Sequence, residues 1–299
     1  MKRGHWQILL AAALFLLALG LTLYPVVSNW YIGRHQSRIQ TEYREVLEQT
    51  DSAEIESIRE SAVAYNKTIT PGAAEEAYSQ ASIRAASEDY VNQLNVSGSG
   101  IMGYVEIPKI GVDLPIYHGT GADSLDRGTG HLLGSSLPVG GESTHTIITG
   151  HSGIASQKMF TDLEQLREGD IFYLHVLDET LAYEVREIHT VLPHDTTYLG
   201  IEPGEDLCTL VTCTPTGVNT HRLLVQGSRI PYVQTEETEA SAVPHEENTD
   251  SNWEKQYWLG VRLGLAAMVF LTLVAGAVLY IRRNRGRAVH RKGGRYVRK

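Results

Sequence analysis

Residues 207–215 read LCTLVTCTP, and residues 216–225 continue as TGVNTHRLLV. The run of Thr, Leu and Val favours a β-strand up to Cys213, and a Pro and a Gly then interrupt it before LLV resumes a second strand. An antiparallel return would bring Cys213 close to Arg222. A thiolate is a good nucleophile, and a neighbouring guanidinium can favour the thiolate or stabilise the oxyanion formed after attack. The stretch therefore predicts acyl chemistry at the end of a strand.

The chain has two cysteines, Cys208 and Cys213. Five residues of extended strand span roughly 16 Å, whereas a disulfide needs Cα atoms within roughly 7 Å, so these two cannot pair while the strand is intact. Their odd separation also points them to opposite faces. Cys208 is expected to be a small buried apolar residue. For Cys213 this stretch alone leaves two interpretations open, an inert core thiol or a reactive one.

Two long apolar segments bracket the chain, residues 8–27 and residues 263–281. Each is long enough to cross a hydrocarbon core of about 30 Å. The first could instead be a cleaved signal peptide, but no clear Ala-x-Ala site follows it, so an uncleaved anchor is preferred. Lys and Arg flank the outer side of both segments, which predicts that both termini are cytoplasmic and that the chain between them is extracellular.

The charge distribution agrees with this division. All 35 acidic residues lie between positions 30 and 256, against 14 Lys and Arg, which gives this region a net charge of −21. A region this acidic is not expected to bind nucleic acid. The basic residues 282–299 resemble a nucleic-acid patch, but directly after a membrane span such a tail is more often an orientation signal and an anchor to anionic lipids.

Helical spacing marks residues 34–66, where Asp51 or Ser52 is the expected cap of a second helix. Thr70 and Pro71 can start a third. The apolar stripe is thin, so this segment is expected to lie against another surface. A Gly/Ser-rich stretch at residues 96–100 follows and is expected to be a hinge or a linker.

From residue 101 onward the pattern changes to short β-strands. Seven or eight strands in about 130 residues indicate a closed or nearly closed β-barrel. Thr161 and Glu164 match a capping box for a brief helix. No His/Cys/Asp group has metal-ligand spacing. Besides the closing pair, the predicted strands are residues 103–108, 112–117, 146–149, 171–176 and 181–188.

A nucleophilic Cys needs a proton acceptor and donor, usually a His. Of the twelve His, His151 is the best candidate because it ends an apolar strand and enters a Gly-flanked loop, where binding sites are often built. His221 directly precedes Arg222 and so points to the opposite face. Arg222 could also be an ordinary surface-pairing arginine.

Three ordered motifs resemble those of sortases, the membrane-anchored cysteine transpeptidases of Gram-positive bacteria. TLVTC at 209–213 matches their TLxTC signature, TGH at 149–151 matches their histidine motif, and Arg222 in NTHRL matches their arginine. The similarity covers about residues 101–232. With a second, C-terminal span, the chain is most similar to class C, the pilin-polymerising sortases.

The resemblance implies a mainly β fold, an eight-stranded sortase-type β-barrel with short helices, preceded by a helical segment and flanked by two transmembrane helices. It implies that Cys213 attacks the Thr carbonyl of an LPxTG-like sorting signal, cleaves Thr–Gly and holds the acyl part as a thioacyl-enzyme. His151 would transfer the protons, and Arg222 would stabilise the oxyanion or position the substrate. The expected acceptor is a pilin lysine, and no metal or cofactor is needed.

The expected partners are LPxTG-type pilin or surface-protein precursors, an amine acceptor and the membrane, with no nucleic acid. The expected location is the cell membrane of a Gram-positive bacterium, with the catalytic domain outside. Two alternatives stay open: a housekeeping-type sortase that uses a peptidoglycan precursor as acceptor, and a non-catalytic scaffold of pilus assembly. Class C lids usually carry an Asp-Pro-aromatic motif, whereas this chain has no Asp-Pro and its nearest Pro is Pro71.

The expected parts are a membrane anchor or signal-anchor (1–30), a helical and lid segment (31–100), the catalytic barrel (101–232), an acidic linker (233–256), a transmembrane helix (257–281) and a basic cytoplasmic tail (282–299).

Overall fold

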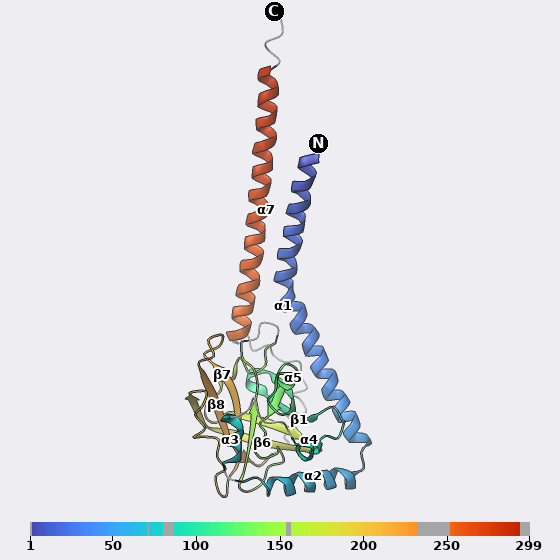
Figure 1. Ribbon diagram of the computed structural model, residues 1–299, viewed down its shortest axis with the longest axis vertical. Coiled ribbons are helices and arrows are strands. Elements are labelled where there is room, and N and C mark those ends of the chain that lie inside the picture. The colour runs from blue at the N-terminus through green and yellow to red at the C-terminus, as the bar shows by residue number, and fades with distance from the viewer. Residues whose placement is uncertain (1, 71, 80–86, 154–156, 233–251, 294–299) are drawn as a thin grey trace, which may run out of the picture. The chain divides into compact units, whose positions relative to one another are not determined.

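The computed structural model describes residues 2–70, 72–79, 87–153, 157–232 and 252–293 (Figure 1). The chain forms two compact units, one of residues 1–28 with 254–299 and one of residues 29–253. Most of the linker predicted at 233–256 lies outside the described residues.

The two longest helices are α1 (Lys2–Gln49) and α7 (Asn252–Gly293). Within the described residues, one segment is long and apolar enough to cross a membrane, the 21 residues Trp258–Val278 of α7, with a mean hydropathy of 2.1. The apolar run at 8–27 lies in α1 but does not meet the same test among the described residues. Two transmembrane helices are therefore not confirmed, and the first span stays a prediction.

Eight strands close into a barrel, as the strand pattern predicted, in the order β1-β2-β3-β4-β7-β8-β6-β5. Two neighbouring pairs, β2 with β3 and β4 with β7, are parallel, and the others are antiparallel. The strands are β1 (Ile101–Ile107), β2 (Val112–His118), β3 (Thr129–His131), β4 (Thr144–Thr149), β5 (Ile171–Val176), β6 (Glu179–Val191), β7 (Asp206–Thr214) and β8 (His221–Ile230).

Short helices accompany these strands. The N-terminal helical segment continues with α2, α3 and α4, and the barrel connections contain η1, α5 and η2. Their bounds are α2 (Ser52–Asn66), α3 (Ala73–Ser79), α4 (Glu88–Asn92), η1 (Pro108–Ile110), α5 (Ala122–Leu125) and η2 (Leu163–Gln165).

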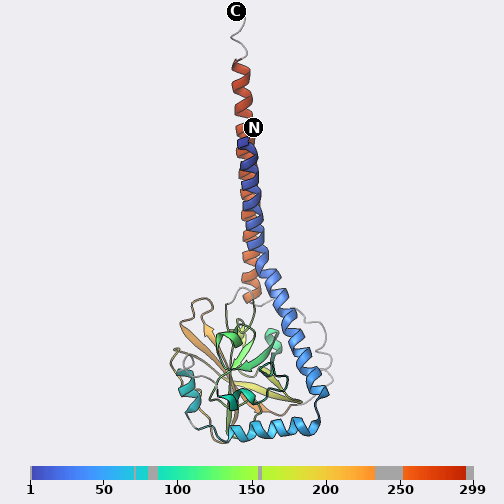
Figure 2. The ribbon, with the colours of Figure 1, turned by 45° about the vertical axis from the view of Figure 1, so that its right-hand side comes forward.

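The N-terminal helices pack on the barrel, which explains their thin apolar stripe. Tyr43 at the end of α1 is buried, and its hydroxyl donates to Met102 O and accepts from Leu177 N, both at 3.1 Å. Helix α2 runs along one end of the barrel in both views (Figures 1 and 2), and its Ile55 and Ala62 join the main core. Burial of these side chains stabilises the docked helices.

Two predicted helix starts have different outcomes. Asp51 caps α2, because its side chain accepts a hydrogen bond from Ala53 N at 2.8 Å. The prediction of a capping box at Thr161 is wrong, since η2 begins without a side-chain cap. The Thr161 hydroxyl instead accepts a hydrogen bond from Gly153 N at 3.0 Å, so it fixes a loop. Pro71, expected to start the third helix, lies outside the described residues.

Candidate active site

The two cysteines of β7 lie in different surroundings. Cys208 is fully buried in the main core, and burial raises the pKa of its thiol well above the ordinary value. Cys213, near the end of the same strand, is half-buried. The contrast confirms the expectation that Cys208 is an apolar core residue and leaves Cys213 as the accessible thiol of β7.

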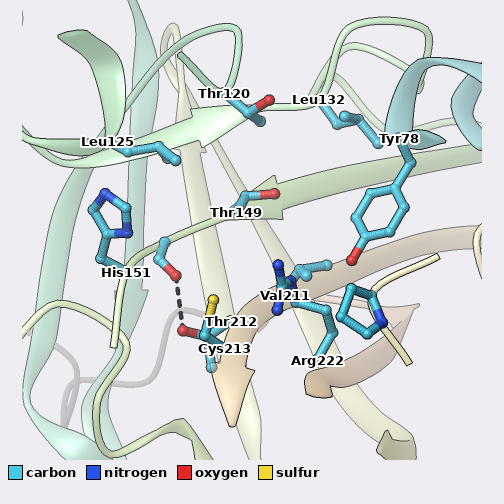
Figure 3. Close-up of a pocket in the computed structure, with 12 residues that line it drawn as sticks. Tyr78, Thr120, Leu125, Leu132, Thr149, His151, Val211, Thr212, Cys213 and Arg222 are labelled. Carbon is cyan, nitrogen blue, oxygen red and sulfur yellow. Dashed lines mark hydrogen bonds between the residues drawn. The ribbon is translucent and has the colours of Figure 1, made fainter. Parts of the chain in front are cut away.

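Strand register brings three predicted site residues into one row. Cys213 is the antiparallel partner of Arg222 on β8. On the other side, the parallel β4–β7 pair ends with Thr149 opposite Val211, and continuing that register places His151 opposite Cys213. Residues in register on neighbouring strands project to the same face. All three therefore line one cavity of about 260 Å³, with the Cys213 sulfur between His151 and Arg222 (Figure 3).

The guanidinium of Arg222 is held by the loop between β7 and β8. Its Nη1 donates to His221 O at 3.1 Å and to Asn219 O at 3.4 Å. No carboxylate forms an ion pair with Arg222 among the described residues. Its positive charge is therefore not neutralised by a described neighbour, as an oxyanion-binding group requires.

His151 lies on a loop whose shape depends on a glycine. A Cβ at Gly150 would come within 2.7 Å of the Phe160 ring, so a larger residue there would displace the loop. The His151 carbonyl accepts a hydrogen bond from Phe160 N at 2.9 Å. Its ring Nε2 lies 3.8 Å from Asp126 Oδ1, a carboxylate that sequence reasoning did not single out.

Tyr78 of α3 is a further site residue that the sequence did not reveal. It lines the cavity, and its hydroxyl points toward Arg222 (Figure 3). Burial raises the pKa of the Tyr78 hydroxyl, and the charge of Arg222 acts in the opposite direction. The hydroxyl forms no hydrogen bond of normal distance and angle with a described residue, so its interaction with Arg222 is a weaker electrostatic contact. An isolated aromatic residue in an Ala- and Glu-rich helix was the available signal.

The rest of the cavity wall is mostly apolar, with Leu125, Leu132, Pro193 and Val211 as its apolar residues. Such a wall suits an extended peptide with apolar side chains. Among the described residues, no group of three or more His, Cys, Asp or Glu could hold a metal ion. The arrangement combines an accessible thiol, an imidazole and a guanidinium, which is a set of groups for acyl transfer.

The family profile described as "Sortase domain" matches residues 105–230. The crystal structure of sortase C from Streptococcus pneumoniae is similar at 47% identity and a TM-score of 0.60, over 65% of this chain and 97% of that one. A pilus-related sortase C of group B Streptococcus is similar at 40% identity and a TM-score of 0.59, over 64% and 97% of the two chains. Sortase A of Streptococcus agalactiae is 30% identical over 117 residues, which cover 38% of this chain and 47%, about half, of that protein.

Proposed function

The chain belongs to the sortase family, and on that premise we propose that it is a cysteine transpeptidase of the class C type, which joins LPxTG-like substrates to an amine. The observation that carries the proposal is the row of Cys213, His151 and Arg222 in one cavity. The similarity to sortase C structures favours a pilin as substrate and a pilin lysine as acceptor.

In the first half-reaction His151 takes the proton of the Cys213 thiol, and the sulfur attacks the carbonyl carbon of the Thr in the sorting signal, so that a C–S bond forms and the carbonyl oxygen becomes an oxyanion. Arg222 stabilises the negative charge on the carbonyl oxygen in the tetrahedral intermediate. The Thr–Gly C–N bond then breaks, and His151 gives a proton to the departing Gly amine. The thiol proton is thereby transferred to the leaving group, and the acyl part stays on Cys213 as a thioester.

In the second half-reaction a neutral acceptor amine attacks the thioester carbon. His151 takes the proton that the amine loses, and the C–S bond breaks to release the Cys213 thiolate. Return of that proton to the sulfur restores the starting state. A cavity with apolar walls limits water near the thioester, which favours attack by an amine over hydrolysis.

Membrane attachment suits this reaction. A substrate that is itself held in the membrane meets a tethered enzyme at a raised effective concentration. The segment Trp258–Val278 has the length and composition for such a tether. We place the barrel outside the cell and both termini in the cytoplasm, as the flanking basic residues indicate.

Helix α3 takes the place of a lid in this proposal. Tyr78 and Ala74 pack with Leu132, Val211 and Leu224 on the face of the barrel beside Cys213. Tyr78, rather than the Asp-Pro-aromatic motif that is missing here, would anchor this lid. A substrate peptide would have to displace Tyr78 to reach Arg222.

The test uses the full chain in detergent micelles with a labelled LPxTG peptide, followed by mass spectrometry. A thioacyl adduct on Cys213 is expected in the wild type and absent in Cys213→Ala. The Tyr78→Ala variant is measured in parallel, so that a closed lid is not mistaken for an inactive enzyme. The absence of an adduct from both wild type and Tyr78→Ala would leave the non-catalytic scaffold as the better interpretation. Competing a pilin lysine against a peptidoglycan cross-bridge amine distinguishes the class C type from the housekeeping type.

A further inference from the structure

Two hydroxyl–carbonyl hydrogen bonds join the strand end that carries Cys213 to the loop that carries His151. Thr212 Oγ1 donates to Gly150 O at 2.7 Å (dashed in Figure 3), and Ser152 Oγ donates to Cys213 O at 2.5 Å. Each hydroxyl belongs to a chain neighbour of Cys213 or His151 and bonds to the opposite segment. We name this pair of bonds the hydroxyl clasp. Thr212 is only 3% exposed and Ser152 only 8% exposed, so water competes little for either bond.

The clasp begins where the backbone ladder ends. Thr149 and Val211 are the last paired residues of β4 and β7, and a bond of 3.0 Å from Gly150 N to Val211 O follows them. Beyond Gly150, no backbone hydrogen bond between described residues joins the two segments. Past that point, the two side-chain hydroxyls supply the direct hydrogen bonds between the His151 segment and the Cys213 segment, while the bonds from Phe160 N to His151 O and from Gly153 N to Thr161 Oγ1 tie the His151 loop to other parts of the barrel.

Packing restricts the same loop from another side. Gly153 has a φ of +74°, and a Cβ there would lie 3.0 Å from Thr216 Cγ2 and 3.1 Å from Gly217 N. The loop after His151 thus lies against the loop after Cys213. This contact limits how closely the two loops approach, but it contains no directional bond that fixes the register of His151 against Cys213. The clasp supplies two such bonds.

We propose that Thr212 and Ser152 are positioning residues that hold the His151 imidazole within proton-transfer reach of the Cys213 thiol. Proton transfer needs heavy atoms about 2.6–3.2 Å apart, directly or through one water. A misplacement of about 1 Å can lower a rate about a hundredfold. The inference rests on the proposed function for its turnover measurement, whereas the reactivity of the thiol can be measured without any peptide substrate.

The first experiment removes one hydroxyl at a time in the full chain in detergent micelles. Thr212→Val keeps the shape of the side chain, and Ser152→Ala removes the other donor. Thr146→Val is the matched control, since Thr146 is a buried residue of β4 whose hydroxyl donates to Leu137 O at 3.3 Å, outside the cavity. Each clasp variant is expected to lose about tenfold or more in kcat with KM changed less than about twofold, while the control keeps its kcat. Thr212→Ser and Ser152→Thr should restore most of the loss.

The second experiment measures alkylation of Cys213 by iodoacetamide across pH. The effect of His151 on thiol reactivity is the difference between the pH profiles of the alkylation rate in the wild type and in His151→Ala. In Thr212→Val and Ser152→Ala the pH profile of the alkylation rate is expected to shift toward that of His151→Ala. The profile of Thr146→Val is expected to match that of the wild type. Cys208 is buried and serves as the unreactive internal reference.

The proposal would be overturned if Thr212→Val and Ser152→Ala fold and keep both the kcat and the alkylation profile of the wild type. It would equally fail if Thr212→Val lowered only the melting temperature, by as much as Thr146→Val does. The absence of a thioacyl adduct in the wild type would refute the proposed function, and the alkylation comparison would still decide the clasp.

Discussion

The hydroxyl of Tyr78 on α3 points at the guanidinium of Arg222 on β8, so a helix from the N-terminal segment meets the barrel next to the half-buried Cys213 (Figure 3). The two residues come from parts of the sequence 144 positions apart and interact in the same cavity. Under the proposed function, a peptide that approaches Arg222 must first displace the Tyr78 side chain. The relationship makes the lid proposal testable by substitution.

Tyr78→Ala is expected to open the cavity. We predict that alkylation of Cys213 by iodoacetamide becomes about tenfold faster, which corresponds to a shift of about 1.4 kcal/mol between closed and open lid. Tyr78→Phe is the control and should keep an alkylation rate close to wild type, because it keeps the ring that covers the cavity. An unchanged alkylation rate in Tyr78→Ala would mean that α3 does not restrict access.

Arg222→Lys is expected to lose about a hundredfold or more in kcat for peptide cleavage. A lysine keeps the positive charge but cannot reproduce the planar guanidinium with its several donors. The matched control is Arg229→Lys on the same strand, where Arg229 Nη2 pairs with Glu179 Oε1 at 3.6 Å on the surface. If both variants keep wild-type rates, Arg222 does not act in the reaction.

Cys208→Ala should leave turnover within about twofold of wild type and lower the free energy of unfolding by about 1 kcal/mol, because a small buried group is lost from the core. Steady-state peptide cleavage and urea denaturation measure the two quantities. A folded Cys208→Ala protein without activity would show that the buried thiol has a catalytic role after all.

His131 should make the barrel less stable in acid. It is fully buried, Tyr90 donates to its Nδ1 at 2.9 Å, and its Nε2 donates to Ser136 O at 2.8 Å, so the neutral ring is satisfied. Burial lowers the pKa of His131 from 6.5 to about 4. Between these two values the unfolded chain binds a proton that the folded chain does not. The free energy of unfolding therefore falls as the pH decreases through this window, by at most about 3 kcal/mol from this residue.

The measurement is urea denaturation of wild type and His131→Gln at a series of pH values from 7 to 4. His131→Gln is expected to be less stable at pH 7 but to lose less stability on acidification. His145, another buried histidine with a lowered pKa, is present in both proteins and acts in the same direction. Identical pH slopes in the two proteins would contradict the assignment to His131.

Seven of the eight strands could be predicted from the sequence because their signals are local, whereas β3 (Thr129–His131) was not among the predicted strands, since three residues are too few to show an alternating pattern. Alternating apolar residues predicted the strand near 181–188, and the motifs around Cys213 and His151 predicted the candidate site that the structure brings together in one cavity. Which strands pair with each other depends on residues far apart in the sequence, so the parallel pairing of β4 with β7 could not be predicted from either strand alone. Tyr78 was missed because its importance comes from where α3 docks. Thr161 was misassigned because its hydroxyl binds a distant backbone amide instead of starting a helix.

Strands β7 and β8, which carry Cys213 and Arg222, belong to a barrel without a free edge, whereas α3 and the 192–205 connection cover its face. Under the proposed function, the barrel strands carry the reacting groups, and the covering parts control how a substrate reaches them. If the chain acts on sorting signals as we propose, laboratory evolution toward a new signal is expected to change the covering parts while the strands that hold the thiol stay constant.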